Sequence, residues 1–191
     1  TAQGVVSNAE IANALPWVVA LMLVVIFVLL LVTFRSIVIP LVAIGVNLLS
    51  VGATYGLMVL VFQHGFLADL LGFQVLGYVQ NFVPVLLLAL LFSLATDYQV
   101  FLISRVREEY LRTGDNTTAI AKGLTATAPL ITGAALLMVV VFGAFAFTGV
   151  VPIQQLGFGL AVGIALDATI VRMIVVPAAL RLTGRATWWF P

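Results

Sequence analysis

The sequence predicts an all-α, polytopic membrane helix bundle with five transmembrane helices. Hydrophobic residues make up 63% of the 191 positions and charged residues only 8%, which leaves too few polar side chains to coat a water-soluble globule. Five charge-poor runs follow one another, each as long as the roughly 20 residues that a helix needs to cross a bilayer core. Most Lys and Arg residues lie in alternate connections between these runs, as is typical of proteins with several spans.

Charged or turn residues bound the predicted spans. Glu10 and Arg35 bound the first span, and the pair Val151-Pro152 precedes the last. Residues 63–81 connect the second span to the third, and residues 105–122 connect the third to the fourth. Together the spans form a single transmembrane domain over residues 1–191, and they cover residues 11–34, 36–62, 82–104, 123–147 and 153–182.

The distribution of basic residues predicts the orientation of the chain. Outside the span interiors they are Arg35, Arg105, Arg107, Arg112, Lys122, Arg181 and Arg185. Short loops rich in Lys and Arg stay in the cytoplasm. The pattern therefore predicts an external N-terminus, an external loop at 63–81, a cytoplasmic loop at 105–122 and a cytoplasmic C-terminus. An odd number of spans with an external N-terminus further predicts a longer parent protein with another span upstream.

The connections carry local signals of their own. Gly114 followed by Asp115 predicts a helix stop and a new N-cap, so that the helices on both sides extend into the basic loop. Apolar side chains at helical spacing within Phe66–Leu71 predict a short interfacial helix in the external loop. The residues Trp188–Phe190 resemble an aromatic anchor at the inner membrane interface.

Two pairs of glycines predict close packing between helices. Gly52 and Gly56 form a GxxxG pattern in the second span, and Gly159 and Gly163 form another in the fifth. Asp167 continues the four-residue spacing of the second pair, so it shares the face on which another helix should pack. The carboxylate is therefore predicted to point into protein.

Three charged residues lie in the interiors of the predicted spans, away from their ends: Asp97 in the third, and Asp167 and Arg172 in the fifth. Each costs about 3 kcal/mol at a helix centre on insertion scales, so such residues usually face a partner or a wet cavity. Arg172 lies about 140° round an α-helix from Asp167, which makes it a poor partner within the helix. We expect Arg172 to snorkel toward the cytoplasm or to neutralise an acid on another helix.

Asp97 is the strongest candidate for a functional role. Ser93, Asp97 and Ser104 fall within a narrow stripe of an α-helix, so the carboxylate has hydroxyl neighbours along a polar line. Tyr98 lies one step round and can hydrogen-bond across to another helix. A carboxyl group in this position can carry protons, and the alternative is a structural hydrogen-bond anchor between helices.

Composition and motifs exclude several other classes of function. The chain has no cysteine and only one histidine, His64, so a thiolate nucleophile or a zinc site is not expected. A net charge of +1 provides no basic surface for nucleic acid. No GxSxG, HExxH or phosphate-binding loop is present in the sequence, and we expect the protein not to be an enzyme and to need no cofactor.

Three stretches resemble the MMPL-type transporters of the resistance-nodulation-division (RND) superfamily. Phe92–Arg105 is similar to the helix that carries their Asp-Tyr pair, here Asp97-Tyr98. Leu166–Met173 and Gly184–Trp189 are similar to the last span of the family and the segment after it. The specific similarity covers about Phe82 to Pro191, and earlier residues fit mainly by hydropathy.

The resemblance implies an architecture and a mechanism. The parent would have two six-helix repeats, each with a large external domain after its first helix, and this chain would hold the last five helices of the second repeat. Asp97 and Tyr98 would be half of a proton relay completed by the first repeat, with Asp167 and Arg172 as supporting members. The proton would be the coupling ion. The parent would lie among the lipids of a bacterial plasma membrane and would export lipids or other amphiphilic molecules across it.

Some alternatives stay open at this point. A sterol-sensing or receptor-type relative shares the helix architecture, and the drug-efflux branch is a further candidate, although its adjacent acids and intramembrane lysine are not found here. Gln99 stands where many family members carry glutamate, so the subfamily and the substrate are undetermined. The parent could work alone or as a homo-oligomer.

Overall fold

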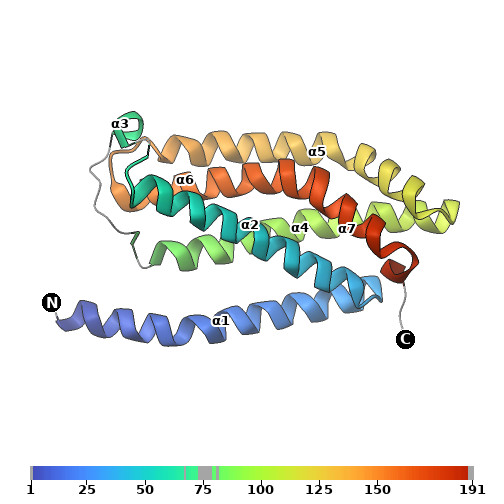
Figure 1. The fold of residues 1–191 in the computed structure, drawn as a ribbon, viewed down its shortest axis with the longest axis horizontal. Coiled ribbons are helices and arrows are strands. Elements are labelled where there is room, and N and C mark those ends of the chain that lie inside the picture. Colours follow the sequence, from blue (N-terminus) through green and yellow to red (C-terminus); the bar gives the residue numbers. More distant parts are fainter. Residues whose placement is uncertain (1, 67, 73–78, 81, 189–191) are drawn as a thin grey trace.

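The computed structural model describes residues 2–66, 68–72, 79–80 and 82–188, with side chains described from residue 16 onward except that of Arg185. Long helices run nearly side by side along the molecule (Figure 1). The described residues contain no strand, which confirms the all-α prediction. In chain order the elements are α1 (Ala2–Phe34), α2 (Val38–Phe62), α3 (Ala68–Leu71), α4 (Phe82–Thr113), α5 (Asn116–Phe145), α6 (Val151–Leu166), the π-helix η1 (Asp167–Val175), α7 (Val176–Thr183) and the 3₁₀-helix η2 (Gly184–Trp188).

Five helices among the described residues are long and apolar enough to cross a membrane. The last of them is continuous from Val151 to Thr183 and consists of α6, η1 and α7. Large apolar side chains on the outer faces are exposed, as expected of surfaces in contact with lipid, among them Leu21, Leu49, Leu137 and Val140. The structure therefore agrees with a membrane bundle of five spans.

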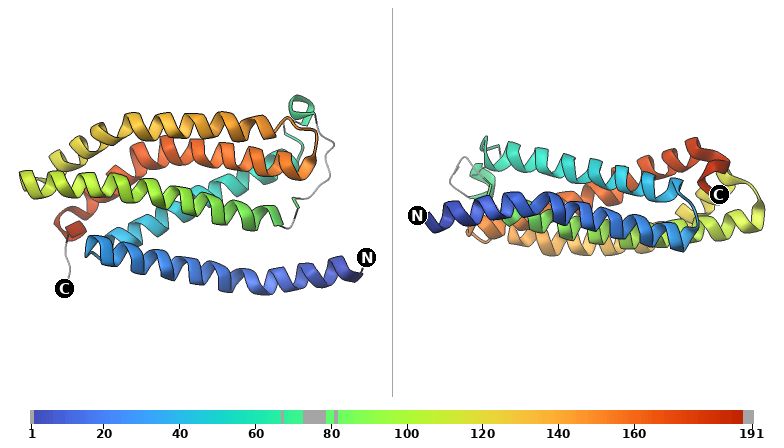
Figure 2. Two further views of the ribbon diagram at one scale, coloured as in Figure 1. Left: turned by 180° about the vertical axis from the view of Figure 1, so that it is seen from behind. Right: turned by 90° about the horizontal axis from the view of Figure 1, so that it is seen from below.

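The helices form one bundle with α1 at its side. α4 packs against α5, α5 against α6, and α2 against both α4 and α6. α1 meets α2 and α4 toward its C-terminal end and diverges from the other helices toward its N-terminal end (Figure 2). The buried side chains Met58, Leu87 and Leu160 belong to the core between α2, α4 and α6. An internal cavity lies between these three helices, α5 and η1.

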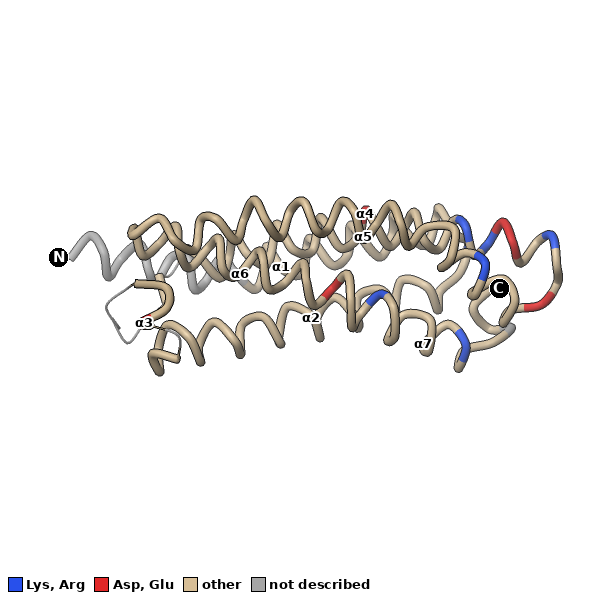
Figure 3. The backbone as a smooth tube through the Cα atoms, turned by 90° about the horizontal axis from the view of Figure 1, so that it is seen from above, with Lys and Arg blue, Asp and Glu red and all other residues tan. Residues whose placement is uncertain are grey.

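The connection between α4 and α5 is a tight turn between two helical extensions, as predicted. Gly114 has a positive φ of 69°, a conformation that suits glycine at a helix C-terminus. Asp115 then caps α5, because its side chain accepts a hydrogen bond of 2.8 Å from the amide of Thr118. Figure 3 shows that Lys and Arg residues gather at this end of the bundle.

The other two local predictions are only partly correct. The helix predicted within Phe66–Leu71 is reduced to the single turn of α3, and Leu67 lies outside the described residues. Trp188 is not a free membrane anchor, because its ring stacks on Tyr110 at 5.0 Å and its Nε1 donates to Oδ1 of Asn116. Trp189 and Phe190 also lie outside the described residues.

The two glycine pairs have different environments. A Cβ atom built on Gly159 or Gly163 would lie within 2.7 Å of a leucine side chain of α4, which confirms close packing there. A Cβ atom on Gly52 or Gly56 would have nothing within 4 Å, and both glycines are exposed. The prediction of close packing at Gly52 and Gly56 is therefore wrong for the described helices of this chain.

Candidate functional site

The centre of the bundle holds a buried ion pair between Asp167 and Arg172. Nη2 of Arg172 lies 2.6 Å from Oδ2 of Asp167. Arg172 is 2% exposed and Asp167 is 8% exposed. A distance of this kind between charged groups indicates a strong, charge-assisted hydrogen bond. The pair removes two charges that would each be costly in the membrane if left alone.

The π-helix η1 explains why this pair forms within one helix. Its hydrogen bonds join residues five apart, so that Asp167 and Arg172 lie one turn apart and on the same face. In an α-helix the same two side chains would diverge. The prediction that Arg172 is a poor intrahelical partner, or snorkels toward the cytoplasm, is therefore wrong, because it assumed α-helical geometry throughout the span.

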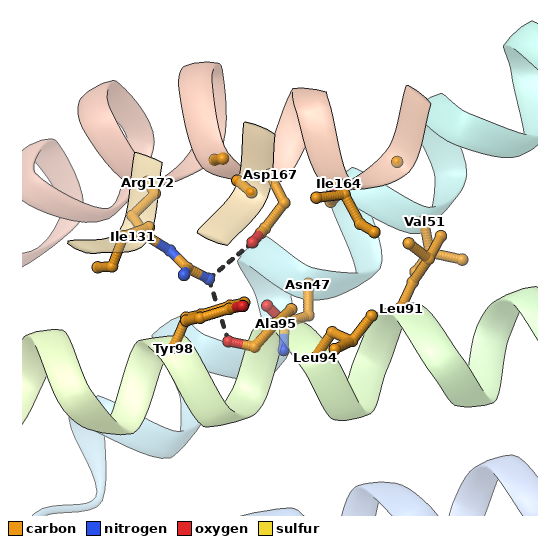
Figure 4. Close-up of a pocket in the computed structure, with 14 residues that line it drawn as sticks. Asn47, Val51, Leu91, Leu94, Ala95, Tyr98, Ile131, Ile164, Asp167 and Arg172 are labelled. Carbon is orange, nitrogen blue, oxygen red and sulfur yellow. Dashed lines mark hydrogen bonds and ion pairs between the residues drawn. The ribbon is translucent and has the colours of Figure 1, made fainter. Parts of the chain in front are cut away.

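Arg172 makes further contacts with α4. Its Nη2 also donates a hydrogen bond of 3.1 Å to the carbonyl of Ala95, and its guanidinium carbon lies 5.1 Å from the centroid of the Tyr98 ring (Figure 4). The second contact is a cation–π interaction, which is strengthened where water is excluded. The Tyr98 hydroxyl in turn lies 3.9 Å from the sulfur of Met138 in α5. The ion pair thus binds the last span to α4.

The ion pair borders an internal cavity that also reaches α2. About 20 Å³ of this cavity is open to the centres of water molecules. Asn47 and Ser50, from α2, line it together with Tyr98, Asp167 and Arg172. Asn47 and Ser50 are 2% and 6% exposed and are not among the predicted site residues. A sequence signal exists for them, because Asn47 is an amide inside a span and Ser50 lies three residues further on the same helical face.

Asp97 lies apart from this group. It is exposed on the outer face of α4, as are Ser93 and Ser104 of the predicted polar stripe. The hydroxyl of Ser104 donates a hydrogen bond of 2.7 Å to the carbonyl of Val100 in its own helix. The structure therefore brings Tyr98 together with Asp167 and Arg172, whereas Asp97, one residue before Tyr98, points away from the bundle.

The arrangement combines a compensated charge pair with an uncompensated acid. Among the described residues Asp97 has no cationic partner within ion-pair distance, and no group of three or more His, Cys, Asp or Glu side chains could hold a metal ion. The backbone of α4 links the two parts, since Asp97 and Tyr98 are adjacent and face different sides of the helix. The structure thus places an exposed carboxylate, Asp97, and a buried ion pair on different sides of α4.

Comparison with known proteins identifies the family. A family model described as MMPL family matches residues 7–191. The chain is 44% identical to membrane protein SCO6666 of Streptomyces coelicolor over 95% of its residues and 26% of that protein. It is 44% identical to the mycolic acid-containing lipids exporter MmpL11 of Mycolicibacterium smegmatis over 86% of its residues and 17% of that protein.

A further relative is the heme uptake protein MmpL11 of Mycobacterium tuberculosis, which is 43% identical over 92% of the chain and 18% of that protein. The chain thus spans about a quarter or less of the length of these relatives. Because the family model matches nearly the whole chain, the match does not depend on a single motif. The chain belongs to the MMPL family of membrane transport proteins.

Proposed function

We propose that the chain is the last five transmembrane helices of a proton-driven exporter of lipids or other amphiphilic molecules. The remaining parts of the parent, in this proposal, are a first six-helix repeat and two external domains. The proton is the coupling ion, no cofactor takes part, and the protein is a transporter and not an enzyme. The parent lies in a bacterial plasma membrane with the C-terminus of the chain in the cytoplasm, as its basic residues favour.

The observation that carries the proposal is the position of Asp97. A carboxylate within a span and on the outer face of its helix would meet hydrocarbon if nothing covered it. The surrounding face of α4 is otherwise largely apolar, with Leu90 and Phe101 exposed beside the two serines. This surface fits a partner helix that supplies a hydrogen-bonding group to Asp97. The first repeat of the parent is the partner that the resemblance implies.

In this proposal, proton binding at Asp97 affects the buried charges through Tyr98. Tyr98 follows Asp97 in the chain, and its ring packs against Arg172 of the last span. A carboxyl group between two repeats can take a proton from one side and release it when its surroundings become wet again. Movement of α4 on protonation would shift Tyr98 and with it the Asp167–Arg172 pair. In this way a proton could change the packing between α4 and the last span.

The names of relatives suggest the class of substrate. One MmpL11 relative is named an exporter of mycolic acid-containing lipids and another a heme uptake protein. Both names describe large, mostly apolar molecules with polar groups. We therefore propose an amphiphilic substrate.

The test compares the complete parent protein with its Asp97→Asn variant at matched abundance in the membrane. Asparagine keeps the size and polarity of the side chain but cannot carry a proton. We therefore expect the rate of gradient-dependent transport to fall by at least about tenfold. A tenfold fall corresponds to an increase of about 1.4 kcal/mol in the activation free energy. Asp69→Asn, in the exposed turn α3, is the matched control and should transport normally.

Two results would contradict the proposal. Undiminished transport by Asp97→Asn would reduce Asp97 to a packing role. Binding of a sterol or lipid without any gradient-dependent movement by the wild-type parent would favour the receptor-type alternative.

A further inference from the structure

Three residues that line the internal cavity carry buried polar atoms with no hydrogen-bond partner among the described residues. These atoms are Nδ2 of Asn47, Nη1 of Arg172 and Oδ1 of Asp167. The residues are 2%, 2% and 8% exposed in that order, so bulk water does not reach them. Buried polar groups in proteins almost always have a partner, either in the protein or in an ordered water molecule. Three such atoms around one cavity therefore need a common explanation.

The three atoms are chemically complementary to water. The Asn47 amide and the Arg172 guanidinium present N–H donors, and the Asp167 carboxylate presents an acceptor. One water molecule can accept from both donors and donate to the carboxylate, and it then has a hydrogen left for another acceptor. Ser50 lines the same cavity and carries a hydroxyl oxygen that can accept it. A buried water typically makes about three such bonds.

The size of the cavity agrees with this chemistry. The room for water centres is about 20 Å³, and a site needs about 10–15 Å³ by this measure to hold one water molecule. The lining comes from α2, α4, α5, α6 and η1, so the cavity lies inside the bundle of this chain. Figure 4 shows the Asn47 side chain between α4 and the last span, on the side of Asp167.

We propose that this cavity is a binding site for ordered water, held by Asn47 of α2 together with Asp167 and Arg172 of η1. The water completes the hydrogen bonds that the ion pair leaves open, and it connects α2 to the π-helix. Asn47 is thus a positioning residue of the charge site. This water site is a feature of how α2 and η1 pack, and it does not depend on what the parent transports.

The test is a density map of the complete parent protein in lipid nanodiscs, at a resolution that shows ordered water. We expect density within hydrogen-bond distance of Asn47 and Arg172 in the wild type. Leucine has the same number of side-chain heavy atoms as asparagine but cannot donate a hydrogen bond, so the density should be lost in Asn47→Leu. Thr54→Val is the matched control, because it removes a buried hydroxyl from the same helix that does not line the cavity.

Several outcomes would overturn the inference. They are a wild-type map without density at the site, a direct hydrogen bond from Asn47 to Asp167, and density that persists unchanged in Asn47→Leu. If Asn47→Leu does not fold, the presence or absence of water density in the wild-type map tests the proposal. Infrared spectra of the wild type in ordinary and oxygen-18 water provide a second measurement, because a buried water should give an isotope-sensitive O–H band. None of these measurements requires transport activity. A negative result for the water site therefore does not contradict the proposed transport function.

Discussion

At the residue scale, Arg172 shows how a cation is stabilised inside a membrane span. Its guanidinium contacts the carboxylate of Asp167, the carbonyl of Ala95 and the ring of Tyr98. Each contact replaces part of the hydration that the charge would have in water. Removal of one partner leaves the other charge buried and uncompensated, which is more costly than removal of both.

The Arg172→Met variant tests this balance. We expect it to lower the free energy of unfolding of the parent by about 3–5 kcal/mol, because Asp167 loses its partner. The double variant Asp167→Asn, Arg172→Met should recover much of that loss. Denaturation by detergent, followed by tryptophan fluorescence, measures both. The exposed pair between Arg105 and Glu108 provides the control, because Arg105→Met should cost only about 0–1 kcal/mol. Equal losses in Arg172→Met and the control would contradict the expectation.

Asp115 provides a prediction that depends on pH. Hydrogen bonds from the Thr118 hydroxyl and amide hold the pKa of this exposed carboxyl below its ordinary value. Because the folded-state pKa is depressed, the contribution of the cap to stability is complete above the ordinary aspartate pKa. It is lost as the pH falls through the lowered value.

We therefore expect hydrogen exchange at the Thr118 amide to speed up on acidification, after correction for the intrinsic exchange rate. Asp115→Asn keeps a good N-cap that does not titrate, so its exchange should show no such dependence. An equal dependence on pH in both proteins would show that the carboxylate is not responsible.

At the element scale, the π-helix η1 is the feature that shapes the site. A π-turn holds more residues than an α-turn, so this segment accommodates an extra residue between α6 and α7. The consequence is that a pair five residues apart becomes a pair of neighbours. Such segments occur often at functional sites, and here the irregularity places a cation and an acid on the same face.

Deletion of Ile170, an exposed residue of η1, tests this interpretation. It leaves Asp167 and Arg172 four residues apart, which makes them neighbours in a regular α-helix. We expect the parent to fold with its ion pair intact and with thermal stability close to that of the wild type. Deletion of Leu136, exposed in the regular helix α5, should be far more harmful, since it rotates the rest of that helix by about 100°. Similar loss of folded protein in both deletions would contradict the role assigned to the extra residue.

At the scale of the whole molecule, the distribution of polar groups differs between the inside and the outer faces. The bundle encloses Asp167, Arg172 and Asn47, whereas Asp97 lies on an exposed face. Gly52 and Gly56 also lie on an exposed face, with open space around them. In the proposal, the described helices contain the supporting part of the relay and only half of its proton-binding part.

We therefore expect the isolated chain, reconstituted in proteoliposomes, to move neither protons nor an amphiphilic probe above the background of empty vesicles. The complete parent should move both when a proton gradient is applied. Gradient-dependent transport by the isolated chain would mean that Asp97 needs no partner from a first repeat.

The fold class and the family follow from the amino-acid sequence alone. Composition and the five apolar runs predict the spans, because the length of an apolar run and the position of charges depend on local sequence. The turn at Gly114 and Asp115 is predictable for the same reason, since a cap requires only nearby residues. The three intramembrane charges were also recognisable from sequence, because their cost in lipid does not depend on how the helices pack.

The arrangement of those charges depends on how the chain folds and how its helices pack. The partnership of Asp167 with Arg172 depends on a π-helix, which a regular helical period cannot reveal. The outward position of Asp97 and the inward position of Asn47 depend on which faces of α2 and α4 meet other helices. In a span that is apolar on all sides, the hydrophobic pattern does not distinguish a face toward lipid from a face toward protein. Packing between helices makes that choice, and it is a property of the folded chain.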